Sequence, residues 1–287
     1  MVRLLTLPGL GLGLAALLTG ATTPRESPPE WSQPAEPFHI AGPIYHVGTE
    51  GIAVYLIKTD KGLILLDGGL EESVPVIEGN ITKLGFKLSD VKLILATHAH
   101  FDHAAGLAAL KQSTGATFAS SEGDREAYET GTPPSEVNYG VIRFAPIKVD
   151  QPLVDGRAVQ LGNVAITPVI TPGHTPGCTT WTMRITDAGR PLDVVFPCSI
   201  SVAGNKLVGN TGYPGIVEDY RRSFTRMRTL KADIVLPAHP ELADLRGRAA
   251  RQAAGDDSAF LAPELLPSMI DQAEAAFEKQ LKAVGGK

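Results

Sequence analysis

The sequence predicts an α/β protein in which helices cover mixed β-sheets. Short apolar runs rich in β-branched residues come in groups, and stretches with a helical period lie between and after those groups. An all-β sandwich would lack these long helical stretches. The chain has 287 residues, 43% of them hydrophobic, which is enough to bury a sizeable core.

The expected strands are short, and Gly, Pro, Asn or Asp bounds many of them. They cover Ile44–Val47, Ile52–Ile57, Gly62–Leu66, Val91–Ala96, Val164–Ile170, Thr179–Ile185 and Val194–Pro197. The expected helices repeat their apolar residues every three to four positions. They cover Glu72–Leu84, Ala104–Ser113, Glu218–Lys231 and Pro267–Val284.

The first 21 residues are expected to form a signal peptide. Arg3 gives a positive start, Leu4–Leu18 is apolar and uncharged, and the small residues Thr19-Gly20-Ala21 suit cleavage. The apolar run is short for a membrane span, and a buried N-terminal helix is the alternative. In a bacterial cell the mature product would then be periplasmic or secreted, without a membrane anchor.

The rest of the chain is expected to be one domain with a short lead-in. Residues 22–37 are rich in Pro, Ser, Thr and Glu, which predicts an extended segment. Residues 38–287 contain no low-complexity linker. Within them, Thr130–Asp150 has turn residues and no clear period, so we expect a long surface loop, and such loops are often functional.

The charge of the chain bears on its possible partners, and its cysteine content bears on the compartment in which it works. The net charge is −5 at pH 7, and basic and acidic residues are interleaved, so nucleic acid is not expected as a partner. Cys178 and Cys198 are the two cysteines. An oxidising compartment would permit a disulfide, but spacing cannot show geometry, and we expect two buried free thiols.

Three histidines and an aspartate converge within six residues, in His98-Ala99-His100-Phe101-Asp102-His103. The segment follows a strand that reads as buried on both faces, and a helical pattern begins directly after it. Alternate side chains of an extended segment point the same way, which puts His98, His100 and Asp102 on one side. Imidazole nitrogen and carboxylate oxygen are ligands that zinc accepts readily. The cluster therefore predicts a zinc centre.

Two further histidines lie on loops at predicted strand ends, where functional sites tend to be built. His174 lies in the turn Pro172–Gly177, and His239 follows the apolar run Ile234–Leu236. Each alone would be an ordinary loop histidine, but next to the cluster both are candidate ligands. His39 and His46 lie in early strand-like segments without companions and are expected to be structural.

With these residues in place, most of the chain after residue 37 resembles the metallo-β-lactamase superfamily. Leu65-Leu66-Asp67-Gly68-Gly69 resembles the family segment that holds an acidic residue behind the metals. The resemblance implies a four-layer αβ/βα sandwich, with the metals at the edge between two sheets. It also implies that Asp67 accepts a proton from a ligand histidine and fixes its tautomer.

Within the superfamily, the chain is similar to subclass 3 of the class B β-lactamases. Most non-lactamase members carry a metal-bridging aspartate where this chain has Phe196–Ser201, which contains no carboxylate. Subclasses 1 and 2 lack the histidine after the motif aspartate, which is His103 here. The resemblance implies two zinc ions per chain. It assigns His98, His100 and His174 to the first, and Asp102, His103 and His239 to the second.

The resemblance also implies a mechanism and substrate contacts. A hydroxide activated by the metals attacks the lactam carbonyl, and Asp102 has a catalytic role in orienting it. Ser199 and Ser201 would bind the substrate carboxylate, or else be two ordinary loop serines. Trp31 resembles an aromatic residue that covers the pocket. Asn205 falls where related enzymes often carry a tyrosine near the oxyanion. A shift of one position would instead make Cys198 a ligand.

The predicted function is hydrolysis of β-lactam antibiotics, which confers resistance. The expected partners are small-molecule β-lactam substrates, and the chain is expected to be a monomer. The alternatives are a lactonase or thioesterase of the same fold, similar to glyoxalase II, and a metal-binding protein that has lost catalysis. The intact ligand set argues against the last, and Ser199 in place of the bridging aspartate argues against the others.

Overall fold

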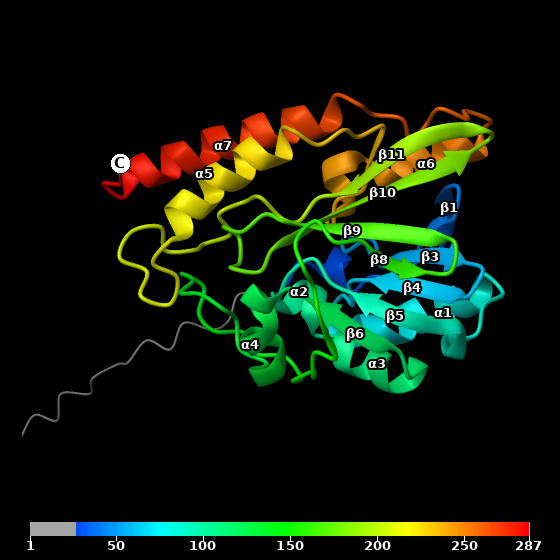
Figure 1. Ribbon diagram of the computed structural model, residues 1–287, viewed down its shortest axis with the longest axis horizontal. Coiled ribbons are helices and arrows are strands. Elements are labelled where there is room, and N and C mark those ends of the chain that lie inside the picture. The colour runs from blue at the N-terminus through cyan, green and yellow to red at the C-terminus, as the bar shows by residue number, and fades with distance from the viewer. Residues whose placement is uncertain (1–26, 287) are drawn as a thin grey trace, which may run out of the picture.

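Two β-sheets face each other, and helices cover the outer face of each sheet (Figure 1). The computed structural model describes residues 27–286, so the predicted signal peptide lies outside the described residues. The layers follow in the order helix, sheet, sheet, helix, which confirms the four-layer αβ/βα sandwich.

The first sheet has seven strands, which lie in the order of the sequence. They are β1 (Phe38–Ala41), β2 (Ile44–His46), β3 (Tyr55–Thr59), β4 (Gly62–Leu66), β5 (Val91–Leu95), β6 (Thr117–Ser120) and β7 (Gln151–Pro152). The pairs from β1 to β4 are antiparallel, and those from β4 to β7 are parallel. The carboxyl ends of β4, β5 and β6 therefore meet at one edge of the sheet.

The second sheet has five strands in the order β12-β11-β10-β9-β8. They are β8 (Val159–Leu161), β9 (Val164–Ile170), β10 (Thr179–Asp187), β11 (Arg190–Phe196) and β12 (Ile234–Val235). Only β11 and β12 pair in parallel.

The helices divide between the two outer faces. They are α1 (Val74–Lys83), α2 (Phe101–Ala104), α3 (Leu107–Thr114), α4 (Glu122–Thr130), α5 (Ile216–Met227), α6 (Leu245–Ala253) and α7 (Leu265–Ala283), with 3-10 turns η1 (Pro29–Trp31), η2 (Glu71–Ser73), η3 (Leu88–Asp90) and η4 (Pro240–Ala243). Helices α1, α3 and α4 pack on the first sheet, and α5 and α7 on the second (Figure 1). Between residues 27 and 286, no helix combines the length and apolarity that crossing a membrane requires.

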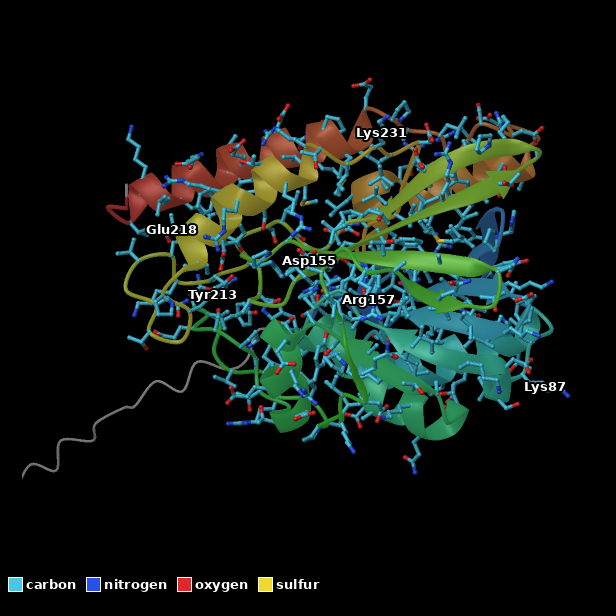
Figure 2. All side chains as sticks on the ribbon, viewed as in Figure 1. Lys87, Asp155, Arg157, Tyr213, Glu218 and Lys231 are labelled. Atoms are coloured by element: carbon cyan, nitrogen blue, oxygen red, sulfur yellow. A yellow bond between two sulfur atoms is a disulfide. The ribbon has the colours of Figure 1, made fainter. Side chains whose placement is uncertain are left out.

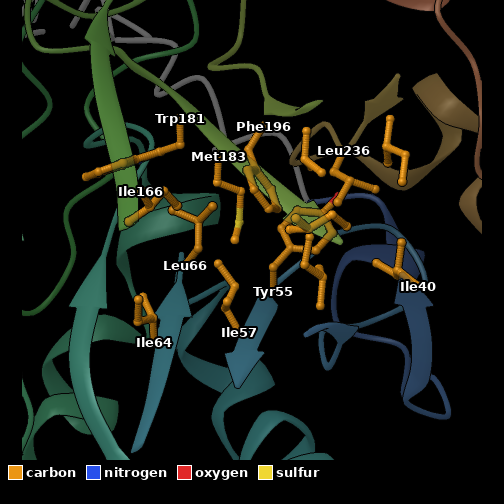
Figure 3. Packing of buried hydrophobic residues seen from close by; sticks show 14 of the residues in the cluster. Ile40, Tyr55, Ile57, Ile64, Leu66, Ile166, Trp181, Met183, Phe196 and Leu236 are labelled. Atoms are coloured by element: carbon orange, nitrogen blue, oxygen red, sulfur yellow. The ribbon is translucent and has the colours of Figure 1, made fainter. Parts of the chain in front are cut away.

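The largest apolar cluster fills the space between the sheets. Ile57 and Leu66 of the first sheet face Trp181, Met183 and Phe196 of the second (Figure 3). Alternate residues of β3 and β4 point to the other face and pack against α1 and α3. Burial on both faces explains why these strands read as continuous apolar runs.

Ion pairs on the surface tie the helices to the sheets. Arg226 of α5 contacts the carboxylate of Asp155 at 2.7 Å, and Asp155 also accepts the backbone N–H of Ile170 at the end of β9 (Figure 2). This contact holds α5 over the end of β9, next to the turn that contains His174.

The predicted elements are present with shifted ends, and several others were missed. Strands β4 and β9 have the predicted bounds, whereas β3 begins three residues later than expected. Strands β6, β7 and β8 and helices α4 and α6 were not predicted. The strand-like segment at His39 is β1, and the apolar run before His239 contains β12. Residues 131–150 contain no helix or strand, as expected for a long loop. The lead-in is not simply extended, because η1 forms a turn within it.

Candidate metal centre

The histidine motif lies where the chain leaves β5 and enters α2. His100 has an extended backbone, with φ −94° and ψ 151°, and the helix begins at the next residue. Asp102 and His103 therefore lie in the first helical turn. The prediction that Asp102 shares one extended segment with His98 and His100 was wrong, because the helix starts earlier than expected. The turn into the helix gives Asp102 and His103 a different direction from the first two histidines.

His174 is positioned by a glycine turn that packs against α5. Gly173 has a φ of +138°, and a Cβ atom there would lie 2.8 Å from the ring of Tyr220. Only glycine allows this conformation and this approach without strain. The Tyr220 hydroxyl donates to the carbonyl of Ser201 at 2.7 Å, and that carbonyl also accepts from His174 Nδ1 at 2.8 Å. This hydrogen bond leaves Nε2 of His174 free for a ligand role.

His239 follows β12 and is held by contacts to the first sheet. The Tyr55 hydroxyl donates to the carbonyl of Pro237 at 2.6 Å, and the N–H of Ala53 donates to the carbonyl of Ala238 at 2.8 Å. Three segments that are far apart in the sequence thus bring histidines to one edge of the sandwich.

Three imidazoles form the first group of candidate ligands. His174 Nε2 lies 2.9 Å from His100 Nδ1 and 3.1 Å from His98 Nε2. All three side chains are buried, and their ligand atoms are close enough together to hold one metal ion. The grouping agrees with the first zinc site that the resemblance implied.

The second group lies directly beside the first. Asp102 Oδ2 is 3.1 Å from His103 Nε2 and 3.5 Å from His239 Nε2. The rings of His98 and His103 have centroids 4.5 Å apart, and His98, Asp102 and His103 also satisfy the spacing for a shared ion. His239 is half-buried, so this group is the more open of the two.

Burial and neighbouring charges set the protonation states of these groups in a way that favours binding of a cation. Burial lowers the pKa of His98 and His174 well below its ordinary range, and lowers that of His100 to about 4. These imidazoles are therefore neutral at pH 7, with lone pairs available to a metal. Burial alone would raise the pKa of Asp102, but His103 and His239 outweigh it and hold that pKa well below its usual value.

The donor set fits a metal ion better than it fits an internal hydrogen-bond network. Nε2 of His103, which faces Asp102 Oδ2 at 3.1 Å, is buried without a hydrogen-bond partner among the described residues. Such an atom normally has a partner, so the lack of one calls for an explanation. Converging imidazole nitrogens and a carboxylate are ligands that zinc binds readily, and a metal ion supplies the missing partner.

Asp67 is connected to the candidate ligand His98 by hydrogen-bond contacts through Thr97. Its carboxylate accepts the N–H of Thr97 at 2.6 Å and the Thr97 hydroxyl at 2.9 Å, and that hydroxyl lies 3.0 Å from His98 Nδ1. Nδ1 of His103 is 3.8 Å from Asp67, which is too long for a hydrogen bond. A direct hydrogen bond from a ligand histidine to Asp67 therefore stays a prediction, and the hydrogen bonds observed connect Asp67 to His98 through the Thr97 hydroxyl.

The two cysteines form a disulfide, so the expectation of two free thiols was wrong. Cys178 and Cys198 have Cα atoms 5.8 Å apart and are joined through their sulfur atoms. They lie just before β10 and just after β11, two neighbouring strands that bring them together. The disulfide also removes Cys198 as a thiolate ligand, which was the alternative reading of this position.

A cleft of about 890 Å³ opens over the candidate ligands. Its walls come from the lead-in, the loop after β11, the loop 131–150, the segment 237–242 and α7. The cleft is lined by His100, Asp102, His174, His239, Trp31, Tyr139, Ser199, Ser201, Met269 and Ala273, among others. Ser199, Ser201 and Trp31 thus lie at the cleft, where the resemblance places substrate contacts.

Asn205 is directed away from the cleft. Its amide donates to the carbonyls of His174 and Val202 at 3.0 and 2.9 Å, and its oxygen accepts from Ser135. A direct contact with substrate would break these hydrogen bonds. The substrate role of Asn205 stays a prediction, and this geometry instead gives it a role in holding the His174 turn.

Two residues near the site were not found by sequence reasoning. Tyr139 lies in the loop 131–150, whose lack of periodicity signalled a loop but no particular side chain. Asp124 is buried in α4 and contacts two of the three segments that carry candidate ligands, and its partners are 25 to 53 residues away in the sequence. No local pattern indicates such contacts.

The metallo-β-lactamase superfamily model matches residues 47–239. Three solved structures are similar over nearly the whole chain. BJP-1, a subclass B3 metallo-β-lactamase of Bradyrhizobium japonicum, has 42% identity and a TM-score of 0.85, covering 89% of this chain and 97% of its own. The native FEZ-1 metallo-β-lactamase of Legionella gormanii has 40% identity and a TM-score of 0.84, covering 88% and 97%.

MEM-A1, a subclass B3 metallo-β-lactamase from a soil metagenome library, has 36% identity and a TM-score of 0.84, covering 89% of this chain and 98% of its own. Identity and coverage of this extent go beyond a shared fold. The chain therefore belongs to the metallo-β-lactamase superfamily and, within it, to the subclass B3 metallo-β-lactamases.

Proposed function

We propose that the protein is a β-lactamase that binds two zinc ions and hydrolyses the amide bond of β-lactam antibiotics, and so confers resistance. The observation that supports it most is the pair of adjacent ligand groups at the floor of one cleft. His98, His100 and His174 would hold the first ion. Asp102, His103 and His239 would hold the second.

Three protein ligands for each ion leave coordination positions open, as catalytic zinc requires. When bound, zinc lowers the pKa of a coordinated water to about 7 and polarises a carbonyl oxygen. No nucleophilic side chain is then needed. Asp102 is ionised at neutral pH, since the histidines beside it keep its pKa low, and its carboxylate can orient a water molecule by accepting a hydrogen bond from it.

The cleft supplies groups that suit a β-lactam. The hydroxyls of Ser199 and Ser201 can donate to the carboxylate that penicillins, cephalosporins and carbapenems share. Trp31 gives an apolar surface beside His239, with ring centroids 5.4 Å apart. Met269 and Ala273 of α7 extend the apolar wall away from the ligands and can accommodate substrate side chains.

The disulfide supports export to an oxidising compartment. Disulfides persist in the periplasm and outside cells and are rare in the cytosol. Together with the predicted signal peptide, the Cys178–Cys198 bond favours a periplasmic enzyme. Fractionation of expressing bacteria, with N-terminal sequencing of the mature protein, tests this. A full-length cytosolic product would exclude it.

A substrate panel tests the function. The purified protein is assayed on penicillins, cephalosporins and carbapenems, and in parallel on acyl-homoserine lactones and thioesters. We expect β-lactam hydrolysis that a chelator abolishes and added zinc restores, with about two zinc ions per chain by elemental analysis. Turnover of lactones or thioesters with no β-lactam turnover would instead support another hydrolase of this fold.

A further inference from the structure

Asp124 lies in the first turn of α4 and is not one of the candidate ligands. Its side chain is 1% exposed, and burial raises the pKa of its carboxyl to about 6. Placing a carboxylate in the interior costs free energy unless hydrogen bonds compensate it. Its three partners identify what it holds together.

The first partner lies inside the histidine motif. Asp124 Oδ2 accepts the backbone N–H of Ala99 at 3.0 Å. Ala99 separates His98 from His100, so this bond fixes the backbone between two ligands of the first candidate zinc site.

The other two partners lie in the turn that contains the third ligand of that site. Asp124 Oδ2 accepts the hydroxyl of Thr175 at 2.7 Å, and Oδ1 accepts the backbone N–H of Gly177 at 2.7 Å. Thr175 directly follows His174. One buried carboxylate therefore joins the loop after β5, in the first sheet, to the loop between β9 and β10, in the second.

The start of α4 packs so closely against this turn that no side chain fits at Gly177. A Cβ atom on Gly177 would lie 2.3 Å from the backbone nitrogen of Asp124. The Ser121 hydroxyl, just before α4, also donates to the carbonyl of Gly177 at 2.5 Å. The start of α4 is thus a rigid support for the turn.

We propose that Asp124 is a positioning residue that sets the separation of His98 and His100 from His174 and thereby the affinity of the first zinc site. The proposal rests on the zinc ligands assigned under the proposed function. Groups that orient metal ligands typically change metal affinity about 10- to 100-fold when they are replaced. Asp124 acts on three ligands at once, through the backbone and not through the imidazole rings.

The test is the variant Asp124→Asn, which keeps the shape but replaces one acceptor oxygen by an NH₂ group. That group would face an N–H or O–H donor, so one link between the loops is lost. Zinc affinities are measured by adding zinc to metal-free protein in competition with a chromogenic chelator. We expect the affinity of one site to fall about 10- to 100-fold. Cobalt substitution should show a changed absorption spectrum, and excess zinc should restore part of the activity.

A matched control separates positioning from general loss of stability. Asp233 Oδ2 accepts the backbone N–H of Asp193 at 2.8 Å, between the start of β12 and β11, and this bond joins neither the loop after β5 nor the loop between β9 and β10. Asp233→Asn should lower stability and leave both zinc affinities unchanged. A milder variant, Thr175→Val, removes one donor to Asp124 and should weaken zinc binding less than Asp124→Asn. It keeps the test decisive if Asp124→Asn does not fold.

Unchanged zinc affinity in both Asp124→Asn and Thr175→Val would overturn the proposal. An equal loss in Asp233→Asn would overturn it as well, because the effect would then be one of general stability. Failure of the proposed function is distinguishable. A parent protein that binds zinc tightly and does not hydrolyse β-lactams would refute that function and leave the positioning role of Asp124 intact.

Discussion

The ring centroids of Trp31 and His239 lie 5.4 Å apart, with the ring planes inclined by 49°. The lead-in thus reaches a candidate zinc ligand from outside the sandwich. Two backbone contacts hold it in place. The N–H of Gly51 donates to the carbonyl of Glu30 at 2.8 Å, and the Thr49 hydroxyl donates to the carbonyl of Trp31 at 2.7 Å.

Replacing Trp31 by alanine should weaken substrate binding. The indole forms part of the cleft wall, and its loss removes apolar contact area worth about 1–3 kcal/mol. We expect KM for cephalosporins to rise about 5- to 100-fold, with a smaller change in kcat. Steady-state kinetics on zinc-saturated enzyme measure both constants. An unchanged KM would mean that substrate does not contact the indole.

Removing a ligand of the first group should have a different effect from removing a ligand of the second group. His98→Ala breaks the first group and removes a neighbour of the second, so activity should be lost. His239→Ala leaves the buried trio intact, and we expect elemental analysis to find about one zinc per chain instead of about two. Full turnover in His98→Ala would show that the ligand assignment is mistaken.

The phenol of Tyr139 should contribute to substrate binding. It lines the cleft, and burial, aided by the charge of Asp102, raises its pKa to about 12, so it is a neutral hydrogen-bond donor at pH 7. Tyr139→Phe removes one donor, worth about 1 kcal/mol, and KM should rise roughly fivefold. Tyr213, which is labelled in Figure 2, donates its hydroxyl hydrogen bond to Asp219. It is not among the residues that line the cleft. Tyr213→Phe is the control and should leave KM unchanged.

The disulfide should stabilise the protein without taking part in metal binding. Cys178 and Cys198 are 20 residues apart, and closing a loop of that length stabilises the folded state by about 3 kcal/mol through the unfolded chain. Replacing both by serine should lower the free energy of unfolding in urea by about this amount. Zinc content should stay the same. A loss of zinc would reopen the question of a sulfur ligand.

Titration of Asp124 should appear in the stability of the metal-free protein. Folding raises the pKa of this carboxyl from 3.8 to about 6, so the folded state holds the proton more tightly than the unfolded state. Below pH 4 both states are protonated, and the group has no effect. As pH rises from 4 to 6, the parent should lose about 3 kcal/mol relative to Asp124→Asn and then level off. Urea unfolding in the presence of a chelator measures this difference, and a constant difference across pH would contradict it.

The sequence predicts the fold where local patterns reflect burial. Strands β4 and β9 were placed to the residue, because their apolar runs end at turn residues on both sides. The short strand β7 and the helix α6 were missed. Strand β7 has two exposed residues and exists only through its pairing with β6. Helix α6 buries a single residue, Leu245, so its apolar period is weak.

The candidate ligands could also be predicted from the sequence, but the contacts that hold them in place could not. His98 to His103 lie together in the sequence, and resemblance to a family adds His174 and His239. The disulfide depends on β10 and β11 lying side by side, and the role of Asp124 depends on the packing of α4 against a turn more than 50 residues away. Such contacts depend on the tertiary structure and produce no periodic pattern in the sequence.

The six candidate ligands come from both halves of the sandwich. The motif at His98–His103 follows a strand of the first sheet, and His174 and His239 follow strands of the second. A bound ion is therefore a cross-link between two layers. By mass action, free zinc at 100 times the dissociation constant would add about 3 kcal/mol per site to the stability of the fold. Zinc scarcity would then lower both the activity of the enzyme and the stability of its folded state.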